Sequence, residues 1–94
     1  MKVVVSNTAL GNMRAIREYY SSTSPAYAQR VITAVYRRFR QVAAFPESGA
    51  VLEDYGLPQI RQVIEGNYRI IYRIMPQGIE ILAVRHGAQA WPAE

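Results

Sequence analysis

The residues that could take part in chemistry are one histidine and a large set of arginines. His86 is the only histidine of the 94-residue chain, and histidine is the one side chain that titrates near neutrality without a pKa shift. Ten of the eleven basic residues are arginine, and the formal net charge is +4. Because the planar guanidinium matches phosphates and carboxylates, we expect an anionic partner, either nucleic acid or an acidic protein segment. The alternative is a merely solvated basic surface.

Several classes of site are excluded by what the sequence lacks. The chain has no cysteine, which excludes disulfides, thiolate metal sites and a cysteine nucleophile. It also has no glycine-rich phosphate loop, no His-Glu-x-x-His or similar metal-ligand spacing, and no serine–histidine pair with an orienting acid. We therefore expect no cofactor and no metal. No run is long enough for a signal peptide or a membrane span, so we expect a cytoplasmic protein.

The first half of the chain predicts a short strand followed by two helices. Residues 3–5 are β-branched and are typical of a strand. The first helix is predicted to begin with Asn7 or Thr8 as its cap and to end at the polar run 21–24. Its apolar face is expected to contain Leu10, Met13, Ile16 and Tyr19 or Tyr20.

The second helix has the clearer boundaries. Ser24 and Pro25 indicate a cap and a first turn, and Pro46 ends the helix near Phe45. Apolar residues recur at intervals of three and four, at Ala28, Val31, Ile32, Val35, Phe39, Val42 and Ala43. The other face contains Arg30, Arg37, Arg38 and Arg40. The short connection between the two helices predicts an antiparallel hairpin.

The second half of the chain predicts an antiparallel sheet. The expected strands are 60–65, 68–75 and 79–86. Their connections are so short that only an antiparallel meander can form, and the strand at 3–5 must pair at one edge of it. Residues 46–58 are expected to cross irregularly from the helices to the sheet. The predicted fold class is therefore α+β, in a single domain over residues 1–94.

The middle strand has two different faces. One contains Tyr68, Ile70, Tyr72 and Ile74, and we expect it to pack on the helices. The other contains Arg69, Ile71, Arg73 and Met75, with the two arginines about 13 Å apart. A partly apolar face with arginines is typical of an interface. The alternative for these arginines is a salt bridge with Glu53, Asp54 or Glu65, which would contribute little stability if exposed.

Three segments carry a resemblance to a known family. They are the strand Tyr68-Arg69-Ile70-Ile71-Tyr72-Arg73 after a glycine turn, the late segment Val84-x-His86-Gly87-x-x-x-Trp91, and the helix end at 43–49. Together with the order of elements, they resemble the RelE/ParE superfamily of toxins from bacterial type II toxin–antitoxin systems. The resemblance covers nearly the whole chain, is closer to the ParE-like branch, and implies the fold of that superfamily.

The resemblance implies two possible activities. The RelE-like branch is similar to ribosome-dependent endoribonucleases that cut messenger RNA without a metal. The ParE-like branch is known for inhibiting DNA gyrase without hydrolysis. In both branches an antitoxin wraps the toxin with its C-terminal part, and its N-terminal part commonly binds operator DNA.

The nuclease alternative would use Arg61, Arg69 and His86 as catalytic residues. By position, Arg69 matches an arginine that RelE-like nucleases use on phosphate, Arg61 lies where they place basic residues, and some members have a catalytic histidine near His86. The stretch 87–92 departs from that branch because it has no cation and no tyrosine, and Gln89 stands where many relatives have arginine. Without a second base, His86 is more simply a structural residue at a strand end.

We therefore interpret the chain as a ParE-like toxin that acts by binding DNA gyrase and is neutralised by a cognate antitoxin. The alternatives are a RelE-like messenger RNA endoribonuclease and a non-toxic binding module of the same fold. Trp91 is expected to pin the C-terminal tail. The residues expected to bind antitoxin or target are Arg30, Arg37, Arg38, Arg69, Arg73 and Trp91.

Overall fold

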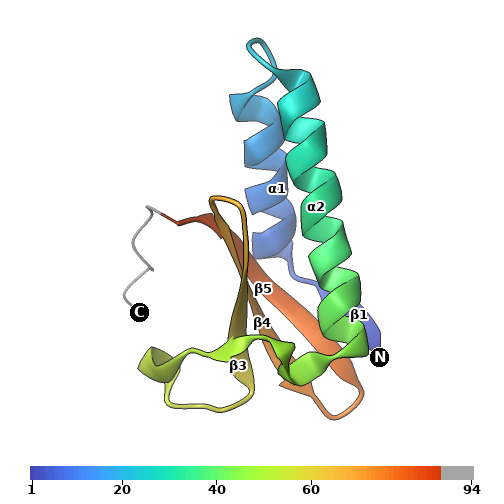
Figure 1. Ribbon diagram of the computed structural model, residues 1–94, viewed down its shortest axis with the longest axis vertical. Coiled ribbons are helices and arrows are strands. Elements are labelled where there is room, and N and C mark those ends of the chain that lie inside the picture. The colour runs from blue at the N-terminus through green and yellow to red at the C-terminus, as the bar shows by residue number, and fades with distance from the viewer. Residues whose placement is uncertain (88–94) are drawn as a thin grey trace.

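A helical hairpin packs on one face of a five-stranded sheet, as Figure 1 shows. The computed structural model describes residues 1–87. The elements in chain order are β1 (Lys2–Val5), α1 (Asn7–Tyr19), α2 (Pro25–Ala44), β2 (Ala50–Val51), β3 (Ile60–Glu65), β4 (Tyr68–Met75) and β5 (Gly78–His86), with 3-10 turns at Pro46–Ser48 and Glu53–Tyr55. The predicted α+β fold, with its strand, hairpin and meander, is confirmed.

The strand order in the sheet is β1-β5-β4-β3-β2. β3, β4 and β5 form the predicted antiparallel meander, and β1 pairs in parallel with β5 at one edge. The β3–β4 turn contains Gly66 at φ 58°, a conformation that favours glycine. The other edge is β2, within the crossing segment (residues 46–58), which was predicted to be irregular throughout. That prediction was wrong for β2 because two residues are too few to give a period-two pattern.

The two helices begin at serine caps. Ser6, rather than Asn7 or Thr8, caps α1: its Oγ accepts a hydrogen bond from the Ala9 amide at 3.0 Å. The prediction was wrong because Ser6 still has an extended backbone while Asn7 is already helical. Ser24 caps α2 as predicted, accepting from the Tyr27 amide at 3.3 Å. Within residues 1–87, neither helix combines the length and the apolar character needed to cross a membrane.

The buried face of α1 is shifted from the predicted one. Met13 and Ile16 are buried and Tyr20 packs against the core, as predicted, and Ala9 is buried as well. Leu10 is instead 39% exposed, and Tyr19, the alternative to Tyr20, is 77% exposed. The small Ala9 side chain, which is fully buried, lies on the side of α1 that packs on β5, and Leu10 is turned about 100° away from it. The helix therefore leaves two large apolar side chains on its outer surface.

The hydrophobic core lies mainly between the helices and the sheet. As predicted, Tyr68, Ile70 and Tyr72 lie in this core with residues of both helices, and Tyr72 is fully buried. A second, smaller cluster lies on the opposite face of the sheet, where Leu52 of the crossing segment covers Ile71. Ile71 is therefore only 1% exposed and cannot form the open apolar face that was expected between Arg69 and Arg73.

Candidate functional site

Arg61 of β3 holds the crossing segment in place. Its Nη1 donates to the carbonyl oxygens of Gly49 at 3.0 Å and Glu47 at 3.3 Å, and its Nε donates to that of Pro58 at 3.2 Å. One guanidinium thus binds backbone oxygens from both ends of the segment. Sequence reasoning missed this structural role, because no side-chain pattern marks a bond to backbone carbonyls.

The side-chain hydroxyl of Tyr72, on β4, also holds the crossing segment in place. It donates to the Pro46 carbonyl at 2.6 Å and accepts from the Gly49 amide at 3.0 Å. Burial raises the pKa of Tyr72, so the hydroxyl keeps the proton that it donates. Gly49 has no room for a side chain, since a Cβ there would lie 2.5 Å from the Tyr72 hydroxyl oxygen. The turn that follows α2 is therefore fixed by contacts with the sheet.

The two arginines of β4 both have side-chain partners on the sheet. Arg69 donates through Nε to Oε1 of Gln62 at 3.0 Å, and Arg73 forms an ion pair with Glu80 of β5. The acids named from the sequence, Glu53, Asp54 and Glu65, are not these partners. Glu65 instead pairs with Arg38 of α2 at 2.9 Å. The sequence could not select these pairs because they depend on the cross-strand register.

His86 lies at the end of β5, opposite the first residue of β4. Its ring meets the ring of Tyr68 edge to face, with centroids 5.4 Å apart and planes at 81°. Tyr68 belongs to the helix-facing core, whereas Arg69, the next residue, points to the opposite face of the sheet. The structure therefore places His86 and Arg69 on opposite faces, and it does not bring Arg61, Arg69 and His86 together.

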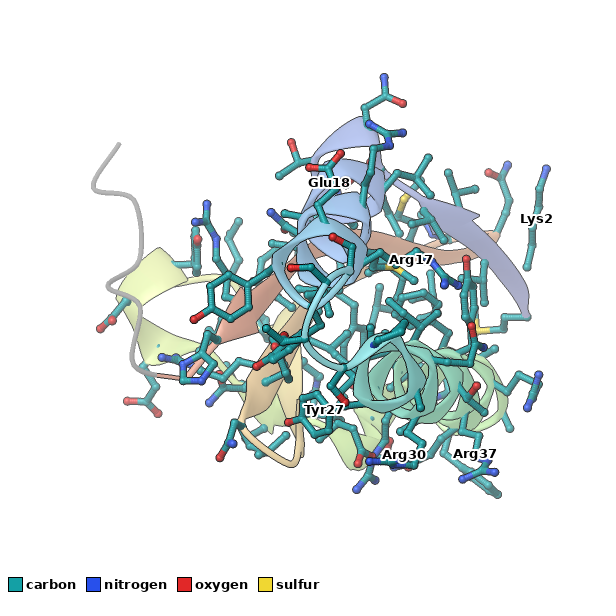
Figure 2. All side chains as sticks on the ribbon, turned by 90° about the horizontal axis from the view of Figure 1, so that it is seen from above. Lys2, Arg17, Glu18, Tyr27, Arg30 and Arg37 are labelled. Carbon is teal, nitrogen blue, oxygen red and sulfur yellow. The ribbon has the colours of Figure 1, made fainter. Side chains whose placement is uncertain are left out.

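The arginines of α2 differ in their surroundings. Arg38 is engaged by Glu65 and by Gln41. Arg30 and Arg37 lie on the side of α2 that is turned away from α1, as Figure 2 shows. The guanidinium carbon of Arg30 lies 5.8 Å from the centre of the Tyr27 ring, and Arg37 has no ion pair within residues 1–87. These two cations are open to solvent.

A groove between α1 and α2 combines apolar and basic groups. It has a volume of about 210 Å³. Leu10 and Tyr36, both more than a third exposed, lie in it beside Arg14 and Arg17. Arg17 donates to the side chain of Gln29 across the groove at 3.1 Å. Arg14 and Arg17 were not among the residues predicted to bind a partner, because the packing of α1 against α2 is not visible in the sequence.

Two further predictions concern metal ions and the tail. Among residues 1–87, no three or more histidine, cysteine, aspartate or glutamate side chains gather where they could hold a metal ion. Trp91, which was expected to bind antitoxin or target, lies outside the described residues.

Comparisons with known proteins agree with this fold. The chain resembles a solved structure described as the chromosomal ParDE TA system from P. aeruginosa, with a TM-score of 0.74 and 19% sequence identity over 92% of this chain and 95% of that chain. A comparison with curated proteins gives no match. The family model of the ParE toxin of the type II toxin–antitoxin system parDE matches residues 3–91. Since that match spans almost the whole chain, the protein belongs to the ParE family of type II toxin–antitoxin toxins.

Proposed function

We propose that this ParE-family toxin arrests growth by binding DNA gyrase in the cytoplasm, without hydrolysing a substrate, and that a cognate antitoxin neutralises it. The observation that carries the proposal is the separation of the three residues that a nuclease of this superfamily would use. Membership of the ParE family supports the part of the proposal that concerns a toxin and its antitoxin. The separation of Arg61, Arg69 and His86 supports binding to gyrase over cleavage of messenger RNA.

Metal-free cleavage of RNA requires a base for the 2′-hydroxyl, an acid for the leaving oxygen and a cation for the charged intermediate, all at one phosphate. Here Arg69 and His86 lie on opposite faces of the sheet. Nε and Nη1 of Arg61 donate to three carbonyl oxygens of the crossing segment. The three side chains therefore do not converge on one phosphate.

The proposal is tested by two purified assays run side by side. We expect the protein to inhibit DNA supercoiling by gyrase and to leave messenger RNA intact on translating ribosomes. Cleaved RNA, with cleavage lost in Arg69→Ala or His86→Ala but kept in the surface control Lys2→Ala, would establish the nuclease instead. A protein that is inactive in both assays, and that does not slow growth when expressed, would be a non-toxic binding module.

The surface that best suits an antitoxin is formed by the outer side of the helical hairpin. Leu10 and Tyr36 offer apolar contact in the α1–α2 groove, and Arg14 and Arg17 border it. Arg37 adds an exposed cation with no ion pair among residues 1–87. An amphipathic segment with acidic residues beside its apolar face would match this pattern.

Charge reversal tests this antitoxin surface. With the protein encoded beside the toxin as the ligand, Arg14→Glu is expected to weaken binding by about tenfold or more, because an attractive pair becomes a repulsive one. Lys2→Glu makes the same change of charge at an exposed position away from the groove and is expected to have little effect. Equal losses in the two variants would mean that only the net charge matters, and this would contradict a specific groove.

A further inference from the structure

A second pocket lies between α1 and the sheet, apart from the α1–α2 groove. It has a volume of about 410 Å³ and is bordered by the C-terminal half of α1, the start of β4 and the end of β5. Half of its described lining residues are aromatic, namely Tyr19, Tyr20, Tyr68 and His86. This volume is within the range of pockets that hold small organic groups.

The aromatic rings form one edge-to-face pair on each side of the pocket. On the helix side, Tyr19 and Tyr20 have centroids 4.8 Å apart and planes at 87°. On the sheet side, Tyr68 and His86 have centroids 5.4 Å apart and planes at 81°. An aromatic ring bound in this pocket would pair edge to face with these rings, which is an arrangement that aromatic groups prefer. It would also cover Tyr19, which is 77% exposed.

The polar groups of the pocket favour a peptide over a nucleotide. Among residues 1–87, the lining contains no arginine, lysine, aspartate or glutamate, so these residues offer a phosphate no fixed counter-charge. Asn12 accepts a hydrogen bond from the Val84 amide through Oδ1 at 3.0 Å. With Oδ1 used in that bond, the NH₂ group of Asn12 donates no hydrogen bond among residues 1–87 and is available to donate to a carbonyl oxygen.

We propose that this pocket binds one aromatic side chain carried by a peptide segment of a protein partner, and that the NH₂ group of Asn12 binds a carbonyl of that segment. The aromatic walls select a flat ring over a branched aliphatic chain, and the absence of cations selects against nucleotides. The site is distinct from the basic α1–α2 groove, and it does not depend on gyrase being the target.

The test uses small probes on the full-length protein. N-acetyl-tryptophanamide is titrated into isotope-labelled protein, and backbone amide shifts are followed by NMR. We expect saturable shifts centred on residues 12–20 and 84–86, with an affinity in the millimolar range. N-acetyl-leucinamide should bind at least about fivefold more weakly, and uridine 5′-monophosphate should give no saturable shift at these residues.

A variant that fills the pocket provides the control. Ala15 lines the pocket and is exposed on α1, so Ala15→Leu should block the site without disturbing the core or the helix. Ala26→Leu makes the same change at an exposed position of α2 outside the pocket. We expect about tenfold weaker binding in Ala15→Leu and unchanged binding in Ala26→Leu.

Three results would overturn the proposal. They are no saturable shift with the tryptophan probe, equal binding of the leucine probe, and equal binding of the tryptophan probe by Ala15→Leu. Preferential binding of the nucleotide would reassign the pocket to a nucleobase. Because the probes are read out by NMR, none of these results depends on inhibition of gyrase.

Discussion

Removal of the Tyr72 hydroxyl group tests whether the sheet holds the crossing segment. In Tyr72→Phe the ring keeps its place in the core, but the Gly49 amide loses its acceptor and the Pro46 carbonyl loses its donor. The Gly49 contact is buried and the Pro46 contact is partly buried, so water can replace only the second bond easily. A buried unpaired amide costs about 1–3 kcal/mol, and we expect a total loss of about 2 kcal/mol in the free energy of unfolding.

The assay is urea unfolding followed by circular dichroism. For a chain of this length, a loss of about 2 kcal/mol corresponds to a Tm lower by about 8–16 °C. The matched control is Tyr36→Phe, since Tyr36 is 42% exposed and its ring packs on Phe39 without needing its hydroxyl. It should change stability by less than about 0.5 kcal/mol. If Tyr72→Phe also lowers the free energy of unfolding by less than about 0.5 kcal/mol, the Tyr72 hydroxyl does not hold the crossing segment as proposed.

Three other changes probe the fold and its pH dependence. Gly49→Ala should lower the unfolding free energy by about 1–3 kcal/mol, because the new Cβ would collide with the Tyr72 hydroxyl; an unchanged urea midpoint would contradict this. Ser6→Ala should cost about 1 kcal/mol or more, because the hydroxyl that caps α1 also donates to the Leu82 carbonyl, and Ser6→Thr, which keeps a hydroxyl, should restore most of it; equal Tm values for Ser6→Ala and Ser6→Thr would exclude the hydroxyl as the cause. Burial, followed by the neighbouring Tyr20, raises the pKa of Tyr68 from 10.0 to about 12. Since the folded state holds this proton more tightly, the contribution of Tyr68 to stability should be constant below pH 10 and fall by about 2 kcal/mol between pH 10 and 12, and Tyr68→Phe should reduce that fall.

The strands and helices were predictable where the pattern of apolar residues is long. The period-two alternation of β4 identified its helix-facing side, and Ser24 with Pro25 located the start of α2. The pattern failed where a short element depends on its neighbours. β2 is a strand only because β3 lies beside it, and Leu52 is buried only because it covers Ile71. Neither contact leaves a periodic signal in the crossing segment.

The candidate site was less predictable than the fold, because each arginine's role depends on what lies opposite it. In the sequence, Arg61 and Arg69 are similar basic residues on neighbouring strands. In the structure, Arg61 binds backbone carbonyls of the crossing segment, while Arg69 binds the side chain of Gln62. Partners of the first kind cannot be found from residue types, since every residue has a carbonyl group. The resemblance to nucleases could therefore suggest these arginines but could not show that they act together.

The positive charge that a partner can reach is distributed unevenly over the surface of the protein. Arg38, Arg61 and Arg73 are engaged within the fold, by Glu65, by backbone carbonyls and by Glu80. Arg37 has no ion pair within residues 1–87 and lies on the outer side of α2 in Figure 2. The positive charge open to a partner is thus concentrated on the helical hairpin rather than spread over the sheet. Because that hairpin also exposes apolar groups, its surface suits an acidic amphipathic protein segment better than a nucleic acid backbone, which offers charge without an apolar face.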